Sequence, residues 1–388
     1  MNRFTIPRDI YFGDNALDIL KTLNGNKAAI VIGGGSVKKS GNLERIQGLL
    51  LEAGIESKMI EGINTEPTVQ MVKEGVKVLN DFQPDWIIGI GGGAAMDAAK
   101  AMWVFYEHPD LTFEEAAKPF NLPKLRTKAK YVGIPTTSGS AAEISNLSVI
   151  TDEKSDIKYP LADFELTPDI AIIDPIMVMS MPKHITAYTG MDALTHSIEA
   201  YVAKPRTAFT DVLAIGAAKI IKDNLLASYN GDDHSRKEMH NAQAMAGMAF
   251  ANAVLGNVHS MAHKSGPIFN IPHGCANAIY LPYVIQFNRT VVADRYAAIA
   301  RRLDLKGQTN DELIDALISY INQINKEMEI PNTLREYGVS EEKFNQHVDD
   351  MAVNAVKDPC TSTNPRETSV EEMKKLYLAA FYGQDVNF

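Results

Sequence analysis

The sequence predicts an α/β domain built on a parallel sheet, followed by an all-helical domain that begins near residue 180. Two observations support this prediction. Short β-branched runs alternate with helical patterns over roughly the first 175 residues, as in sheets wrapped by helices. Beyond that point long helical patterns follow one another, and strand-like runs are almost absent. A length of 388 residues also fits two domains, which we place at 1–180 and 181–388.

Continuous apolar runs predict strands that are buried on both faces, which is typical of parallel sheets. The predicted strands are, in chain order, 28–32, 86–90, 131–134, 147–151 and 170–173. Apolar residues spaced three and four apart predict helices over 42–53 and 69–82. Ligands of such sheets bind at the carboxyl ends of the strands, so we expect the functional residues of this domain just after them.

Helical spacing dominates the second half of the chain. The predicted helices are 191–202, 209–227, 235–256, 291–303 and 370–382. A polar stretch with two prolines, 358–368, predicts a loop before the last helix. We find neither an internal repeat nor a low-complexity stretch.

Composition and charge exclude several classes of protein. Acidic residues outnumber basic ones by 48 to 38, and the formal charge of -10 disfavours binding to nucleic acid or to anionic membranes. Two cysteines are too few for a disulfide framework. The N-terminus lacks a signal-peptide core, and no apolar run approaches the roughly 18 residues of a membrane span. We therefore expect a cytoplasmic protein.

Two glycine clusters, Gly33–Gly35 and Gly91–Gly93, directly follow the first two predicted strands. Glycine lets the backbone approach a phosphate closely, and the N-terminus of a following helix supplies unpaired N–H groups. Neither cluster matches G-x-G-x-x-G, and either one alone is explained equally well by a tight turn. Two clusters at successive strand ends favour a nucleotide site. The polar turn 135–140 after a further strand adds hydroxyl groups suited to phosphate or ribose.

Histidines give a more specific signal in the second half of the chain. Asp192 and His196 are four residues apart, as are His259 and His263, so each pair lies on one face of a predicted helix. His273 follows in a separate turn that can fold back on the second helix. A single histidine in such a place is more often a hydrogen-bonded helix residue. Imidazoles together with a carboxylate suit Fe(II) or Zn(II) better than Mg or Ca, so the combination predicts a metal site.

With these residues in hand, the chain resembles the iron-containing (group III) alcohol dehydrogenases over essentially its whole length. The motifs that carry the resemblance are Gly91-Gly92-Gly93-x-x-x-Asp97-x-x-Lys100, Ile134-Pro135-Thr136-Thr137-Ser138-Gly139-Ser140-x-x-Glu143, Gly190-x-Asp192-x-x-x-His196-x-x-Glu199-Ala200, and His259-x-x-x-His263 with Pro272-His273-Gly274. The stretches 158–163 and 359–366 are particularly similar to the alcohol dehydrogenase half of bifunctional aldehyde/alcohol dehydrogenases.

The resemblance implies a Rossmann-like dinucleotide-binding domain and a helical metal-binding domain, the architecture shared with dehydroquinate synthases. It implies that the metal is held by Asp192, His196, His259 and His273. It implies that His263 stands beside the nicotinamide and the reacting oxygen as a proton relay. It further implies that the dinucleotide is lined by Gly91, Gly92, Gly93, Asp97, Thr136, Thr137, Ser145 and Lys158.

Two departures from the family pattern concern the cofactor. The serine usual after the third glycine is Ala94 here, which removes a hydroxyl but leaves the backbone donors. NAD-preferring relatives carry an aspartate near residue 33, whereas this segment reads Gly33, Gly34, Gly35, Ser36, Val37, Lys38, Lys39. Without an acidic side chain a 2′-phosphate meets no repulsion, and Ser36 and the lysines could bind it. We therefore predict NADP(H) as cofactor, with NAD(H) as the alternative.

The predicted activity is a metal-dependent alcohol dehydrogenase that interconverts short primary alcohols and aldehydes by hydride transfer, with Fe(II) as metal and Zn(II) as a possible substitute. One alternative is a zinc-dependent glycerol or polyol dehydrogenase, or a dehydroquinate synthase, of the same architecture. The four-ligand set and the Thr136-Thr137 loop argue against it. A non-catalytic binding module would be expected to have lost metal ligands, and all four are present. By resemblance we also expect a homodimer with the N-terminal segment at its interface.

Overall fold

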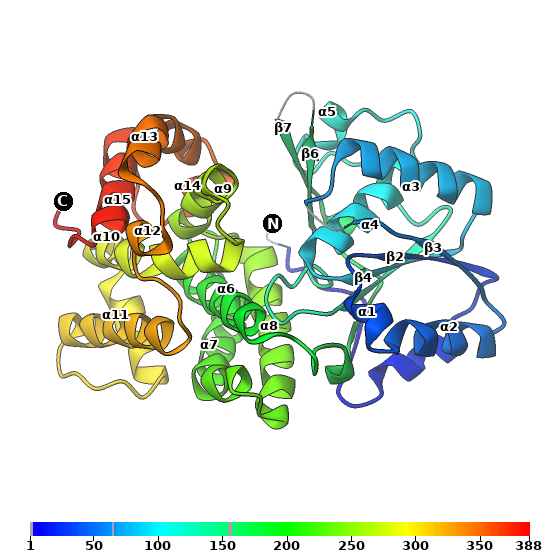
Figure 1. Cartoon of the computed structure of the whole chain (residues 1–388), viewed down its shortest axis with the longest axis horizontal. Helices are drawn as coiled ribbons and strands as arrows, with labels where there is room; N and C mark the ends of the chain where they lie inside the picture. Colours follow the sequence, from blue (N-terminus) through cyan, green and yellow to red (C-terminus); the bar gives the residue numbers. More distant parts are fainter. Residues whose placement is uncertain (1–2, 64–65, 154–156) are drawn as a thin grey trace. The chain divides into compact units, whose positions relative to one another are not determined.

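The computed structural model describes residues 3–63, 66–153 and 157–388. The chain divides into two compact units, Met1–Met181 and Pro182–Phe388, which are described separately below. The first is an α/β unit and the second is helical, as the ribbon in Figure 1 makes plain. The predicted fold class is therefore confirmed.

The first unit is built on a six-stranded sheet in which every paired strand runs parallel to its neighbour. In the order of the sheet the strands are β1 (Asp9–Phe12), β8 (Ile170–Ile173), β5 (Lys130–Pro135), β4 (Trp86–Gly91), β2 (Lys27–Ile32) and β3 (Glu56–Ile60). From β2 the chain moves outward to β3 and then returns to β4 on the other side of β2. This reversal places a topological switch point between β2 and β4, where ligands of such sheets bind.

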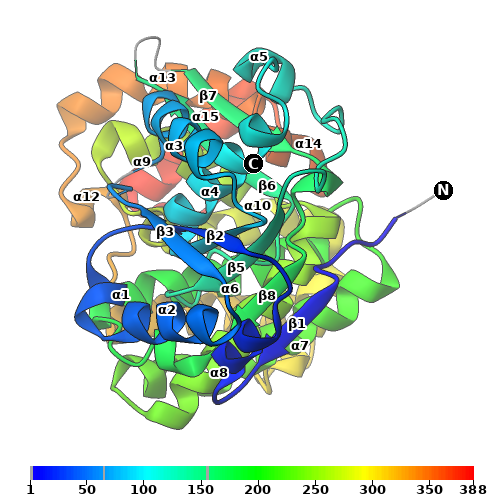
Figure 2. The same ribbon diagram turned by 90° about the vertical axis from the view of Figure 1, so that its right-hand side faces the viewer.

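Helices cover both faces of this sheet (Figure 2). The helices of the unit are η1 (Ala16–Thr22), α1 (Ser36–Lys39), α2 (Asn42–Glu52), α3 (Val69–Phe82), α4 (Gly93–Glu107), α5 (Phe113–Ala116), η2 (Phe164–Leu166) and η3 (Pro175–Met177). In β2, Ile30 and Ile32 pack with residues of α2, whereas Ala29 and Val31 pack with residues of α3 and α4. This alternation explains why the strand is apolar throughout.

One predicted strand has a different partner from the one expected. The segment 147–151 forms β6 (Leu147–Asp152), but it pairs antiparallel with β7 (Ile157–Ala162) in a separate two-stranded sheet. The expectation that it belongs to the parallel sheet is wrong. The alternating burial of β6 fits a hairpin with one covered face better than the centre of a parallel sheet.

Within the described part of the chain, all the regular secondary structure of the second unit is helical. The helices are α6 (Lys183–Val202), α7 (Ala208–Tyr229), α8 (Asp233–Ala253), α9 (Asn257–Phe269), α10 (His273–Arg302), α11 (Asn310–Glu327), α12 (Leu334–Tyr337), α13 (Glu341–Val356), α14 (Pro359–Thr363) and α15 (Val370–Tyr382). The predicted helix 291–303 corresponds to the last part of α10, which has a kink at Val292. The predicted loop 358–368 contains the short helix α14. No helix among the described residues is both long and apolar enough to span a membrane.

Candidate active site

The three glycine-rich or polar turns of the first unit lie at one edge of the sheet. Ile32 pairs with Ile90, and Gly91 pairs with Pro135, so β2, β4 and β5 end side by side. The backbone N–H of Thr136 donates to the Gly91 carbonyl oxygen over 2.9 Å. The turns after these strands therefore meet at the carboxyl edge, next to the switch point.

The glycines in these turns do two different things. A Cβ at Gly33 would lie 2.9 Å from the Cβ of Ala95, and one at Gly91 would lie 2.6 Å from it, so both allow α4 to pack closely on the strands. Gly34 has φ of 62°, and open space surrounds its Cβ position. Gly92 caps α4 without any side-chain hydrogen bond. Backbone N–H groups at the start of this 15-residue helix suit a phosphate group, so the turn fits a dinucleotide.

Two of the predicted cofactor residues make hydrogen bonds between α4 and the segment 145–149. Asp97 Oδ2 accepts a hydrogen bond from the Val149 backbone N–H over 3.2 Å. Ser145 is buried, and its carbonyl oxygen accepts a hydrogen bond from Lys100 Nζ. Thr136, Thr137 and Ala94 are partly exposed at the sheet edge. The backbone of Lys158 pairs within β7, but its side chain lies outside the described part of the structure.

Lys100 is fully buried. Besides the Ser145 carbonyl, its Nζ lies 3.4 Å from Ser145 Oγ and 3.2 Å from the Leu147 carbonyl oxygen, so three acceptors match the three N–H groups of an ammonium. Burial lowers its pKa to about 8, although the nearby carboxylates of Asp97 and Glu143 raise it. We infer that Lys100 joins α4 to the hairpin, a structural task within the motif that resembles the phosphate turn.

The segment predicted to contact a 2′-phosphate is exposed. Ser36 and Lys39 lie on the surface at α1. Lys38 forms an ion pair with Glu61, an acidic residue just after β3. Because Lys38 already has a carboxylate partner, Lys39 is the lysine of this segment without one among the described residues.

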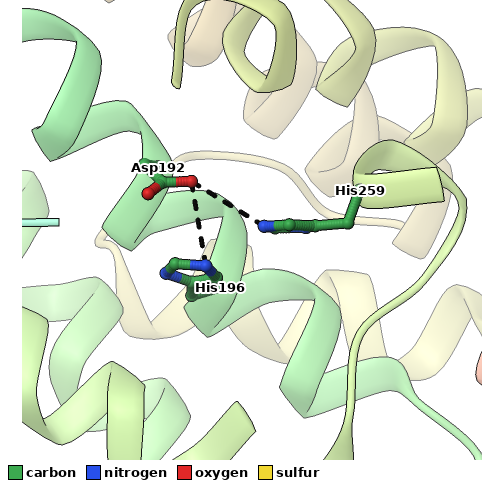
Figure 3. Close-up of side chains that lie close together, drawn as sticks. All are labelled: Asp192, His196 and His259. Atoms are coloured by element: carbon green, nitrogen blue, oxygen red, sulfur yellow. Dashed lines mark ion pairs between the residues drawn. The ribbon is translucent and has the colours of Figure 1, made fainter. Parts of the chain in front are cut away.

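In the second unit, side chains from three helices converge on one oxygen atom. Asp192 Oδ1 lies 3.7 Å from His196 Nε2 and 3.7 Å from His259 Nε2. Figure 3 shows these three side chains. His273 Nε2 lies 3.6 Å from the same oxygen. Atoms bound to one ion at 2.0–2.2 Å with tetrahedral angles are about 3.3–3.6 Å apart, so these separations suit a small divalent cation.

The protonation state of His259 is set by a buried carboxylate. His259 Nδ1 lies 2.6 Å from Glu199 Oε2, and the other oxygen of Glu199 accepts a 2.8 Å bond from the Val258 backbone N–H. A carboxylate only accepts, so Nδ1 carries a proton and Nε2 is the nitrogen that faces Asp192, where a metal ion would replace its proton. Burial lowers the pKa of His259, but hydrogen bonds with Asp192 and Glu199 raise it overall, to about 9. The site thus favours positive charge.

The hydrogen bonds of Asn277 show whether the cluster has room for a cation in its bonding scheme. Its Nδ2 lies 2.7 Å from Asp192 Oδ1 and 3.1 Å from the Nε2 atoms of both His259 and His273. Two amide hydrogens cannot satisfy the acceptors of a carboxylate and two imidazoles at once. Burial raises the pKa of Asp192, yet the imidazoles of His196, His273 and His259 hold it well below its usual range. An ionised carboxylate and imidazole nitrogens that lack enough hydrogen-bond donors can serve as metal ligands, and this combination fits Fe(II) or Zn(II).

Close helix contacts hold these ligand atoms in place. A Cβ at Gly274 would lie 2.1 Å from the Tyr188 carbonyl oxygen and 3.3 Å from Asp192 Cβ, so the first turn of α10 rests directly on α6. This contact brings His273, the first residue of α10, beside Asp192. A Cβ at Gly256 would meet Glu199 Oε1 at 2.8 Å. Glycine at both positions therefore lets α6, α9 and α10 approach closely enough for their side chains to meet.

His263 lies next to the cluster and, like the exposed His273, is far more accessible than the buried Asp192, His196 and His259. Its side chain is 37% exposed, and its ring stacks on that of His273 with centroids 5.5 Å apart. His263 Nδ1 is 3.0 Å from Asp358 Oδ2. Phe250 stacks on another member of the cluster, His196, with centroids 4.3 Å apart. An apolar ring beside a polar cluster suits a substrate that has both an apolar chain and an oxygen atom.

Sequence reasoning missed three polar residues of this site. Glu199, Asn277 and Asp358 contact His259, Asp192 and His263 respectively, but no role was predicted for any of them. Glu199 and Asn277 could have been found, because each follows a predicted ligand at helical spacing: three residues after His196 and four after His273. Asp358 lies 95 residues from His263, and no local pattern connects them.

A sheet edge suited to a dinucleotide and a helical cluster suited to a metal together define a metal-dependent, nicotinamide-linked oxidoreductase. The sequence profile of iron-containing alcohol dehydrogenases matches residues 7–175, and that of the C-terminal part of the same family matches residues 186–381. The chain belongs to the iron-containing alcohol dehydrogenase family.

Individual relatives agree with this assignment. The chain is 54% identical to an NADPH-dependent butanol dehydrogenase of Clostridium saccharobutylicum, over the whole length of both proteins. It is 39% identical to the bifunctional aldehyde-alcohol dehydrogenase AdhE of Escherichia coli, with 98% of this chain covering 46% of that protein. An iron-containing alcohol dehydrogenase from Thermococcus thioreducens superimposes with a TM-score of 0.91 at 36% identity, covering 98% and 100% of the two chains. A 1,3-propanediol oxidoreductase does so with a TM-score of 0.93 at 32% identity, with the same coverage.

These findings confirm three predictions: the family resemblance, the fold class and the class of enzyme. The chain is an alcohol dehydrogenase of the iron-containing type, which interconverts alcohols and aldehydes. The alternative of a zinc-dependent polyol dehydrogenase is not favoured, since both family profiles and the Thermococcus thioreducens structure are of the iron-containing type.

Proposed function

We propose that this enzyme interconverts short primary alcohols and aldehydes, with NADP(H) as hydride carrier and Fe(II) as its metal. The proposed metal ligands are Asp192, His196, His259 and His273. The observation that carries the proposal is the convergence of three imidazole Nε2 atoms on Asp192 Oδ1 at 3.6–3.7 Å. A bound divalent ion supplies Lewis-acid chemistry that lowers the pKa of a substrate alcohol, and the nicotinamide carries the hydride.

The side chains around the metal site have distinct tasks in this proposal. Glu199 holds the His259 ring with Nε2 free for coordination. Phe250 shields His196 and offers an apolar surface to a short alkyl chain. His263 takes up the proton released by the alcohol and passes it to solvent, in keeping with its partial exposure. In aldehyde reduction the same group returns the proton.

For the dinucleotide, we propose that the turns after β2, β4 and β5 bind its phosphates and riboses. The backbone at the start of α4 and the hydroxyls of Thr136 and Thr137 are placed for this at the sheet edge. Lys39, and not Lys38, supplies the charge for a 2′-phosphate, because Lys38 is paired with Glu61. The NADPH dependence named for the Clostridium saccharobutylicum relative supports this preference.

Two further points belong to the proposal. A second copy of the chain pairs along β1, whose outer edge has no strand partner among the described residues and whose Phe12 is 70% exposed. The enzyme works in a reducing, cytoplasmic compartment, consistent with the two buried free cysteines Cys275 and Cys360. Sedimentation analysis tests the dimer: a monomer at micromolar concentration would contradict it.

The deciding experiment measures butanal-dependent oxidation of NADPH and of NADH by protein stripped of metal and reloaded anaerobically with Fe(II) or Zn(II). We expect Fe(II) to restore turnover, and NADPH to react faster than NADH. Faster reaction with NADH would overturn the cofactor assignment and leave the metal site standing. Recovery with Zn(II) alone would overturn the assignment of iron. No turnover with either metal across short aldehydes would overturn the proposed reaction.

Variants separate the metal ligands from the proton relay. His259→Ala and His273→Ala should lose metal and activity together, whereas His263→Ala should keep its metal and turn over more slowly by about 10²-fold or more. His234→Ala, an exposed histidine on α8, is the matched control and should match the wild type. Wild-type turnover by His263→Ala would remove the relay from the proposal.

A further inference from the structure

Asp358 is a buried carboxylate that receives three hydrogen-bond donors. Its side chain is 5% exposed. Oδ2 lies 3.0 Å from His263 Nδ1 and 2.9 Å from Lys264 Nζ. Oδ1 accepts a 3.1 Å bond from the Cys360 backbone N–H, which caps the short helix α14. Burial raises the pKa of Asp358, but the bonds from His263 and Lys264 hold it well below its usual range.

Three donors surround the Asp358 carboxylate, so it acts here as an acceptor, and the hydrogen between Asp358 and His263 belongs to Nδ1 of the imidazole. Whenever the ring is neutral, its lone pair is therefore on Nε2. We propose that Asp358 is a positioning residue that holds His263 as this tautomer, with Nε2 as the proton acceptor of the reaction. This inference rests on the proposed function, in which His263 is the relay.

The ring of His263 is held on two sides. Asp358 fixes one edge, and the face of His273 lies nearly parallel to it, with 11° between the planes. A ring that is bonded at Nδ1 and stacked on a neighbour has little freedom to rotate about its χ angles. The remaining accessible surface, 37% of the side chain, leaves a route by which a proton can reach solvent.

The proton balance of alcohol oxidation fits this arrangement. The alcohol loses a hydride to the nicotinamide and its hydroxyl proton to His263 Nε2, and the aldehyde forms. The imidazolium then has protons on both nitrogens, and its charge is stabilised by Asp358 at a 3.0 Å contact. Nε2 releases its proton to solvent, Nδ1 keeps its own, and Asp358 stays ionised throughout.

The ion pair between Lys264 and Asp358 can be removed without removing the contact between Asp358 and His263. Lys264 Nζ bonds to the same oxygen as His263, so the carboxylate keeps a cationic partner even when the imidazole is neutral. Lys264→Met should therefore leave the His263 contact in place and change turnover by less than about threefold, since a second partly exposed charge contributes little.

Asp358→Asn in the full-length, metal-loaded enzyme tests the proposal. Asparagine still caps α14, but its amide nitrogen can donate to His263 and favour the other tautomer. We expect kcat to fall by about 10²-fold, with KM and metal content near wild type. Tm should fall modestly, because the neutral amide loses the ion pair with Lys264. Added imidazole buffer should restore part of the rate, because it replaces the relay. Asp358→Glu should retain more activity than Asp358→Asn.

Two controls make the outcome decisive. Asp350→Asn changes an exposed aspartate on the neighbouring α13 and should behave as wild type. The double variant His263→Ala/Asp358→Asn should be no slower than His263→Ala, because both changes disable one unit.

Wild-type turnover by Asp358→Asn, with His263→Ala still slow, would overturn the role of Asp358 and leave the proposed function intact. A loss of metal, or a loss of turnover that imidazole does not restore, would mean that Asp358 only stabilises the fold around α14. Wild-type turnover by both variants would instead remove the relay itself.

Discussion

The two units offer their ligands different chemistry. The first presents backbone N–H groups and glycine turns at the edge of a sheet. The second brings carboxylate and imidazole side chains from three helices to within 3.7 Å of one oxygen. A site made of backbone tolerates changes of residue type as long as the turn is kept. A site made of side chains depends on each of them.

The largest effect should follow from the loss of the charged ligand. Asp192→Asn keeps the shape of the side chain but removes the negative charge that faces three imidazoles, so metal affinity should fall by more than about 100-fold. Competition with a chelator measures this. Asp350→Asn is the control. An unchanged affinity would mean that the side-chain cluster is not the metal site.

Lys100→Met tests whether the first unit also depends on a buried side chain. Two carbonyl groups and a hydroxyl would lose their donor, and the free energy of unfolding should fall by roughly 3 kcal/mol. Urea unfolding measures the change, and Lys77→Met, on the exposed side of α3, serves as the control. Stability equal to that of the control would show that the hairpin does not need this anchor.

Glu199→Gln should weaken metal binding by about 10- to 100-fold, since glutamine is a poorer acceptor for His259 Nδ1 and can present its amide nitrogen instead. The measurement is again chelator competition, with Glu342→Gln on the surface of α13 as the control. Wild-type affinity would reduce Glu199 to a packing residue.

Gly35→Asp should shift the cofactor preference towards NADH by about tenfold, because the new carboxylate repels a 2′-phosphate and can bind ribose hydroxyls. Gly35 has φ of -110°, and its Cβ position is 3.7 Å from the Lys39 side chain, so a side chain fits there. The ratio of kcat/KM for the two cofactors measures the shift. Gly35→Asn has the same shape without the charge and should shift it less; equal shifts would refute the electrostatic explanation.

The smallest effect concerns pH. The pKa of Asp358 is depressed in the folded state, so its bonds stabilise the protein above about pH 4 and are lost as the pH falls below that value. For metal-free protein, the urea midpoint should drop more steeply between pH 5 and pH 3 in the wild type than in Asp358→Asn. Parallel slopes would contradict this account.

Many of the features that distinguish the two units could be predicted from sequence. The buried strands β2, β4 and β5 are continuous apolar runs, and the Asp192/His196 and His259/His263 pairs have helical spacing, so local patterns were sufficient. Strand β3 was missed because it reads Glu-Ser-Lys over its first three residues and lies at the edge of the sheet, where one side is exposed. The hairpin partner of β6 was missed because strand pairing depends on contacts between segments and not on the pattern within one.

The supporting residues were harder to predict for the same reason. Asp358 meets His263 across 95 residues of chain, and Glu199 meets His259 across 60. The local sequence around residue 36 does not show the proximity of Glu61, because this contact arises from the pairing of β3 with β2, which brings the end of β3 beside α1. In each case tertiary contacts, which no local period encodes, decide the electrostatics of the site.

The contact at Gly274 has a genetic consequence. Every other amino acid has a Cβ, and one at this position would collide with the Tyr188 carbonyl oxygen at 2.1 Å. Each missense change of this codon therefore pushes α10 away from α6 and moves His273 off Asp192, although residue 274 itself binds nothing. Inactivating mutations of this enzyme should accumulate at a codon whose product contributes only the absence of a side chain.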